Sequence, residues 1–237
     1  MSAPSLAGQT VDQLGGRRSV LARQRADHEE LDRLLHELDG ATGTEQLRVL
    51  RAVDRLVFTH ALAEESVLWP VIRRVLPDGE ALTLEIEVEH QQVNELASTL
   101  EPTPLDDPAR PALLARLVEV LQADVREEED ELFPRLQQQV DAATLRRMGL
   151  AWEVARRVSP TRPHPTVSRR PPGNTLSAAP LSVLDRTRDH VDALIQRAPA
   201  SAAAGAGRRV SAVLARAAGW VERLPVVRTG DRPPTSR

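Results

Sequence analysis

Two eleven-residue stretches of the sequence share one pattern, and they constrain the fold more than any other feature. Residues 60–70 read HALAEESVLWP and residues 124–134 read DVREEEDELFP. Each has a His or Asp, three spacers, two glutamates, two further residues and a Leu-aromatic-Pro ending. On a helix, positions i and i+4 are about 40° apart and project side by side. Each stretch therefore presents two neighbouring metal-ligand side chains, and the difference between them is that one begins with His and the other with Asp.

The composition predicts an all-α protein. Aromatic residues make up 2% of the chain, there is no Tyr, and runs of alternating β-branched and aromatic residues are absent, which argues against strands. Apolar residues recur at helical spacing in four long segments and one short one. The predicted helices are 17–38, 45–75, 80–100 and 109–139, followed by a short fifth helix at 141–157.

Ligand-type side chains fall on the core-facing edges of all four long helices. Glu64 lies in an apolar stripe, where a carboxylate is costly to bury unless a cation meets it. Imidazole and carboxylate groups together suit iron, manganese or zinc in a bundle core, and the absence of Cys excludes thiolate sites. The candidate metal ligands are His28, His60, Glu64, His90, Asp124 and Glu128.

The other polar and aromatic residues are not expected to bind metal, with the exception of Asp124. Glu65 points roughly 140° away from the ligand face and is expected to be solvated, and the acidic run 127–131 is expected to be a solvated face apart from Glu128. Asp124 is either a ligand or an acceptor behind one. The remaining histidines are expected to be ordinary, and two aromatic residues to close one end of the core. These residues are His36, His164, His190, Trp69 and Phe133.

These motifs resemble the hemerythrin-like HHE cation-binding domains over about residues 17–140. The residues that carry the resemblance are His28 in DHEEL, His60 and Glu64 in HALAEESVLWP, His90 in EVEHQQ and Glu128 in DVREEEDELFP. The Pro- and Arg-rich segment PTRPHP with the later LDRTRD also looks like the tails of actinobacterial members.

The resemblance implies a four-helix bundle around a non-haem di-iron centre bridged by Glu64 and Glu128. Such centres bind or sense dioxygen, react with peroxide or nitric oxide, or store and sense iron. The sequence departs from the family pattern at Asp124, where the family has His, and at Asn94, where oxygen carriers have a second His. A carboxylate in place of an imidazole favours manganese or ferric iron over reversible dioxygen binding. Peroxide or oxygen chemistry, a catalase-like activity included, or iron sensing is therefore expected rather than oxygen transport.

The charge distribution divides the chain. From residue 158 onward there are 13 arginines against five acids, about +8, which leaves about −11 for the preceding residues within a formal net charge of −3. We expect a flexible lead-in at 1–16, the bundle with its fifth helix at 17–157, a Pro/Arg-rich linker at 158–180, and a basic amphipathic tail of one or two short helices at 181–237.

An acidic body with a basic tail suits cation binding better than specific nucleic-acid binding, and the tail could engage a protein partner. The sequence shows no apolar run long enough to span a membrane and no signal pattern, so a cytoplasmic location is expected. Two other interpretations remain open. One is a regulatory or scaffold module that senses iron or redox state and binds a partner through its tail; the other is a degenerate structural bundle, in which Asp124 would be exposed.

Overall fold

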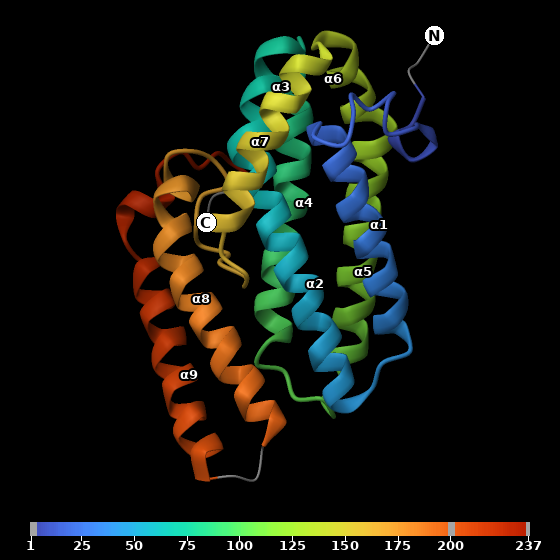
Figure 1. The fold of residues 1–237 in the computed structure, drawn as a ribbon. Coiled ribbons are helices and arrows are strands. Elements are labelled where there is room, and N and C mark those ends of the chain that lie inside the picture. Colours follow the sequence, from blue (N-terminus) through green and yellow to red (C-terminus); the bar gives the residue numbers. More distant parts are fainter. Residues whose placement is uncertain (1–3, 199–201, 236–237) are drawn as a thin grey trace.

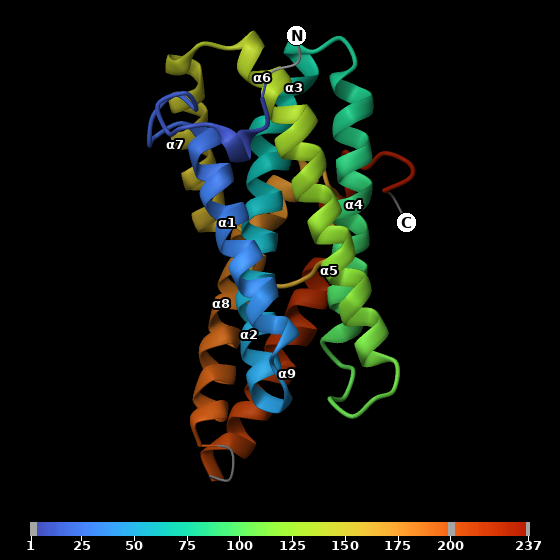
Figure 2. The same cartoon turned by 90° about the vertical axis from the view of Figure 1, so that its right-hand side faces the viewer.

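The computed structural model describes residues 4–198 and 202–235, and its core is a bundle of four antiparallel helical rods (Figures 1 and 2). Among the described residues there is no β-strand, which confirms the predicted all-α, up-down four-helix bundle. Two rods are single helices, and each of the other two contains a wider turn in its middle. The rods are α1 (Val20–Asp39); α2, η2 and α3 (Gly43–Ala63, Glu64–Leu68, Trp69–Val75); α4 (Gly79–Leu100); and α5, η3 and α6 (Arg110–Glu127, Glu128–Leu132, Phe133–Gln139).

The wider turns are two π-helical segments, η2 and η3, which coincide with the paired glutamates of the repeated pattern. In each, the N–H of the aromatic residue donates to the carbonyl five residues earlier: Trp69 to Glu64, and Phe133 to Glu128. The next residue is a proline, which lacks an N–H and whose ring crowds the carbonyl four residues before it in an α-helix. The widened turn accommodates that proline without ending the rod.

Two apolar clusters fill the bundle, one in each half of its length. The first includes Leu21, Ile86 and Leu132, and the second includes Leu31, Val93 and Leu121. On each rod, the candidate ligands lie in sequence between a residue of one cluster and a residue of the other. The antiparallel packing therefore brings the ligand-type side chains to one level, between two apolar layers.

A flexible lead-in was expected for residues 1–16; residues 1–3 lie outside the described residues, and residues 4–16 pack against the bundle. Leu6 and Leu14 are fully buried in the cluster that contains Leu21. The Gln9 side chain donates to the Pro4 carbonyl at 2.9 Å and also bonds to the side chain of Gln137. Two leucines suffice to fix this segment because they cover apolar surface at the open end of the bundle.

A C-terminal extension covers one side of the bundle. The α7 helix (Ala142–Val158) packs on α1 and α2, and a non-helical strap (residues 159–172) then leads to a hairpin of α8 (Gly173–Arg197) and α9 (Ala202–Val221) (Figure 1). The tail helices are long rather than short, and α8 begins eight residues before its expected start at residue 181. A short 3₁₀ turn, η4 (Pro225–Arg228), follows. None of the described helices combines the length and apolar character needed to cross a membrane.

The arginines of the strap are buried and paired with carboxylates. Arg162 lies 2.7 Å from Asp192 and 2.9 Å from Asp189 on α8, and also pairs with Glu101 at the end of α4. Arg170 Nε donates to Glu87 Oε2 at 2.7 Å, and Glu87 is fully buried on α4. Since a buried charge is stable only when it is paired, these contacts fix the strap on the bundle. Two of the strap arginines thus pair with acidic residues of the bundle, Glu87 and Glu101.

His164 joins the two tail helices to the bundle. Its ring is buried, with Nε2 3.0 Å from Asp185 on α8 and Nδ1 2.9 Å from Glu222 after α9. Its backbone N–H donates to Asn94 Oδ1 at 2.8 Å. Burial lowers the pKa of His164, but the hydrogen bonds to Asp185 and Glu222 outweigh it and raise the pKa from 6.5 to about 9. His164 was expected to be ordinary, and the structure gives it a specific docking role instead.

The raised pKa of His164 predicts a pH-dependent docking of the extension. The stabilisation, roughly 3 kcal/mol, is complete below the unfolded pKa and is lost as the pH rises through the folded pKa of about 9. The free energy of unfolding, measured by urea titration, should therefore fall between about pH 7 and pH 10. His164→Gln should reduce the slope without removing it, because His28 and His90 also have raised pKa values in this range. An equal slope in the variant and the natural protein would contradict the assignment.

Candidate metal centre

The six candidate ligands converge at the level between the two apolar clusters. His60 Nε2 lies 3.1 Å from Glu64 Oε1, and His90 Nε2 lies 3.6 Å from Glu64 Oε2. The two oxygens of this one carboxylate therefore face histidines from two different rods. His28 Nε2 lies 3.3 Å from Glu128 Oε2, and His90 Nε2 lies 3.7 Å from Asp124 Oδ1.

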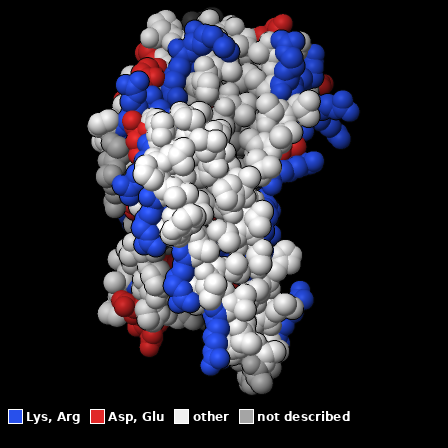
Figure 3. All heavy atoms as spheres, turned by 90° about the vertical axis from the view of Figure 1, so that its left-hand side faces the viewer, with Lys and Arg blue, Asp and Glu red and all other residues white. Residues whose placement is uncertain are grey.

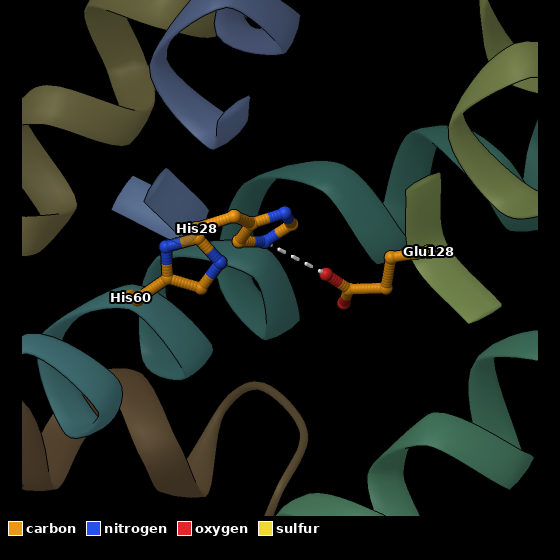
Figure 4. A group of neighbouring side chains, drawn as sticks. All are labelled: His28, His60 and Glu128. Carbon is orange, nitrogen blue, oxygen red and sulfur yellow. Dashed lines mark ion pairs between the residues drawn. The ribbon is translucent and has the colours of Figure 1, made fainter. Parts of the chain in front are cut away.

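Within the described part of the chain, these residues form two groups compact enough to hold a metal ion, and the groups share Glu128. One is His28, His60 and Glu128; the other is Glu64, His90 and Glu128. Figure 4 shows the first group: the rings of His28 and His60 lie side by side, and the Glu128 carboxylate points toward His28 from the opposite rod. Asp124 lies beside the second group but is not part of it.

The carboxylates at the centre are the strongest structural sign that this site suits a cation. Glu64 and Glu128 are completely buried, and none of their four oxygens accepts a hydrogen bond; Asp124 Oδ1 is also without a donor. An unpaired buried carboxylate costs several kcal/mol. A bound cation would satisfy all of these oxygens at once, so the residues present fit a metal ion. The burial of Asp124 opposes the interpretation as a degenerate bundle, which requires this residue to be exposed.

The histidines at the centre favour the proton when no metal competes for them. Burial lowers the pKa of His28, but the facing Glu128 carboxylate and the hydrogen bond to Glu129 outweigh it and raise the pKa to about 9. For His90 the same opposition between burial and facing carboxylates gives a pKa of about 10.

The carboxylates respond to burial and to one another. Burial, together with the charge of Glu128, raises the pKa of Glu64 and raises that of Asp124 well above its usual range. The pKa of Glu128 is lowered, because the attraction of the facing His28 ring, 3.3 Å away, outweighs burial. The cluster therefore retains protons that a metal ion would have to displace on binding.

Each histidine is oriented by a carboxylate on its far nitrogen. His28 Nδ1 lies 2.8 Å from Glu129 Oε1, and His90 Nδ1 lies 3.0 Å from Glu65 Oε1. His60 Nδ1 lies 3.0 Å from Asp27 Oδ2. A proton held between Nδ1 and a carboxylate leaves the Nε2 lone pair directed at the centre, which is the tautomer a metal needs.

Two of these orienting residues correct the predictions from the sequence. Glu65 was expected to be solvated but is 1% exposed, and Glu129 was assigned to a solvated face but faces His28. An ideal α-helix sends the second glutamate of each pair outward, whereas the π-helical turn shifts it inward. The sequence feature that could have indicated the inward position of Glu65 and Glu129 is the Glu-Glu pair in both stretches, followed by a proline.

The comparisons with known proteins agree with this geometry. Residues 19–136 match the family described as "Hemerythrin HHE cation binding domain". The chain belongs to this hemerythrin family. It is also 25% identical over 134 residues to a protein of Schizosaccharomyces pombe described as an "uncharacterized hemerythrin-like protein". That alignment covers 56% of this chain and 66% of the relative's length. No solved structure matches the chain at a significant level.

Residues outside the matched hemerythrin region reach the orienting carboxylates. Arg156 Nη1 of α7 lies 2.6 Å from Asp27, the carboxylate behind His60. Arg169 Nη1 of the strap lies 3.8 Å from Glu65, the carboxylate behind His90. The extension thus places a guanidinium behind two of the three histidines, an arrangement that the sequence analysis missed because nothing in the sequence pairs these distant positions.

Asn94 also connects the hemerythrin region to the extension. It lies one turn after His90, where oxygen-carrying members have a second His. Its Nδ2 donates to the His90 carbonyl at 3.2 Å, and its Oδ1 accepts the His164 N–H. The position is therefore used for docking the strap.

Aromatic rings and a small cavity complete the surroundings. Phe133 stacks on His28, and Trp69 stacks on both His90 and Phe133. Trp69 and Phe133 therefore cover the centre on the side of the first apolar cluster, close to their predicted role. On the other side lies a cavity of about 20 Å³. That is room for about one water-sized molecule. The apolar side chains lining it include Leu31, Val57, Phe58, Val93 and Leu121.

The position of Glu65 predicts an effect on metal affinity. Glu65→Gln removes the charge that orients and polarises His90, and such a change costs about ten- to a hundredfold in affinity in other metal sites. The loss should appear in competition with a chromophoric chelator. Glu85→Gln, at an exposed position of α4, is the matched control and should leave the affinity unchanged. Equal affinities for both variants would show that Glu65 does not support the centre.

Proposed function

We propose that this hemerythrin-family protein holds a dinuclear non-haem iron centre. The observation that carries the proposal is the arrangement of Glu64, whose two buried oxygens face His60 and His90 on different rods. Glu128 is shared in the same way between the two potential metal groups. A carboxylate that faces two sets of nitrogen donors suits a bridge between two ions.

The ligands are divided between two positions in this proposal. His28 and His60 serve one ion, His90 and Asp124 serve the other, and Glu64 and Glu128 bridge them. Asp124 is included because its buried, unsatisfied oxygen lies on the His90 side. The mixture of imidazoles and hard carboxylate oxygens favours iron, with manganese or zinc as alternatives.

The surroundings support chemistry with a small oxidant. Iron in such a site supplies redox chemistry for dioxygen, peroxide or nitric oxide, and the adjacent cavity is large enough only for a molecule of that size. The protein contributes exclusion of bulk water, fixed imidazole tautomers, and carboxylates that can hold protons next to the cavity. The carboxylate at position 124 favours a redox or sensing role over reversible oxygen transport.

Metal stoichiometry tests this proposal directly. Purified protein loaded with ferrous iron under anaerobic conditions should contain about two ions per chain, measured by elemental analysis. His60→Ala should lower this to about one or fewer, because it removes a donor from the His28 position. Asp124→His should retain both ions. His36→Ala, at an exposed position, is the control. A folded protein that takes up no metal would overturn the proposal.

A second candidate function, metal sensing through the extension, is favoured by the two arginine contacts. Arg156 and Arg169 link the extension to Asp27 and Glu65, and these carboxylates touch His60 and His90. If the histidines shift on metal binding, the ion pairs that attach α7 and the strap to Asp27 and Glu65 would change as well. A partner that binds the extension would then bind the metal-loaded and the metal-free protein with different affinities.

Protection of the extension from proteolysis tests the sensing candidate. Iron loading should slow cleavage in the strap several-fold if metal binding and docking are coupled by on the order of 1 kcal/mol. Arg156→Gln combined with Arg169→Gln should abolish the difference between loaded and metal-free protein. Arg33→Gln combined with Arg116→Gln, at exposed sites, is the matched control. Cleavage rates independent of iron in the natural protein would eliminate this candidate.

A further inference from the structure

Exposed apolar side chains gather on the C-terminal extension. Isolated exposed hydrophobic residues are common on soluble proteins, but a group on one face marks an interaction surface. Most of the large exposed hydrophobic residues of the described chain belong to α7, α8, α9 and η4. They are Leu150, Val154, Val158, Leu176, Val183, Leu194, Val210, Val213, Trp220 and Val226.

Those on α8 and α9 share one face of the hairpin, which we call the outer face. On α8, Val183 and Leu194 are 66% and 62% exposed, and Leu181 on the opposite side is fully buried. On α9, Val213 and Trp220 lie seven residues apart, or about two turns, and therefore point the same way. Figure 3 shows a broad uncharged surface on this side of the molecule, with positively charged side chains along its edges.

The charges at the edge of this face are unusual for this protein. Arg209 and Arg216 lie seven residues apart on α9, Arg223 lies seven residues further on, just past the end of the helix, and all three are exposed. None of them forms an ion pair with a described residue, whereas the strap arginines are buried and paired. The exposed positions of α8 and α9 that the structure describes include no Asp or Glu. The outer face is therefore apolar at its centre, cationic at its edge and free of acids.

We propose that the outer face of the α8–α9 hairpin docks on an anionic phospholipid surface. An amphipathic helix with a cationic flank and an exposed Trp lies in the plane of a membrane interface, where lipid phosphates meet the arginines and apolar side chains enter the headgroup region. The chemistry is complementary: the three exposed, unpaired guanidinium groups can bind lipid phosphates, and the apolar stripe can leave water for the headgroup region. The hairpin lies on the membrane surface and does not cross it.

The same features argue against a second copy of the chain as the occupant. Two outer faces packed together would bring arginine-lined edges near one another with no acidic residue between them. The proposal does not depend on the metal centre, which lies in the bundle on the other side of the strap.

Trp220 provides the reporter for a direct test. Of the three tryptophans, Trp69 and Trp152 are buried and Trp220 is 62% exposed, so a change in emission on vesicle addition reports the outer face. Full-length, metal-loaded protein is mixed with phosphatidylcholine vesicles with and without phosphatidylglycerol. We expect co-sedimentation and a blue shift only with the anionic vesicles, and loss of both at high salt. Trp220→Phe should abolish the shift while retaining co-sedimentation.

Charge-matched variants identify the surface. Each arginine near an anionic membrane contributes about fivefold to binding, so R209Q/R216Q/R223Q should weaken the partition coefficient about a hundredfold. The control R33Q/R74Q/R116Q removes the same charge from exposed positions on α1, α3 and α5 and should have little effect. Circular dichroism and metal content, unchanged in both variants, show that the fold is intact.

Three outcomes would overturn the proposal. The first is no binding to anionic vesicles. The second is an equal loss in the control variant, which would indicate attraction by net charge alone. The third is a dimer in light scattering that Trp220→Ser disrupts, or capture of an acidic protein segment in place of lipid, since either would show that the outer face has a different occupant.

Discussion

The burial of two carboxylates, Glu64 and Glu128, in an apolar bundle is the constraint on which the rest of the structure depends. Their negative charges must be opposed by positively charged or proton-donating groups nearby. The two carboxylates accept no hydrogen bond and lie between two apolar layers, so the facing histidines carry the charge that opposes theirs, and the residues present suit a cation. The histidines are in turn held by carboxylates on their far nitrogens. The site is therefore built as concentric layers of alternating charge, with the outermost cations supplied by arginine side chains from the extension.

The π-helical turns make this layering compatible with a straight bundle. A regular helix can direct only one of two consecutive glutamates into the core. By widening the turn at each Glu-Glu pair, the chain buries Glu64 as a candidate ligand and Glu65 as the support of His90. The proline five residues after the second glutamate of each pair favours the wider turn, because its ring and missing N–H disrupt regular α-helical hydrogen bonding.

The extension has two sides with different properties. Its inner side carries buried arginines and His164, which pair with acids of the bundle and of α8. Its outer side carries unpaired arginines around an apolar face. The family match ends at residue 136, so both sides lie outside the matched region. One physical rule accounts for the difference: a guanidinium is stable when buried only if paired, whereas an exposed one remains available to a partner.

The helices, their antiparallel order and the six inward-facing candidate ligands follow from sequence periodicity, because side-chain direction on a helix depends only on local spacing. The same reasoning failed for Glu65 and Glu129, since it assumed a regular helix where the proline imposes a wider turn. It also failed for Leu6, His164, Arg156 and Arg169, whose partners are distant in sequence. Local spacing therefore determined which residues face the centre. Tertiary packing alone decided which carboxylates contact the histidines and which arginines contact those carboxylates. These long-range charge pairs depend on how the extension folds back on the bundle.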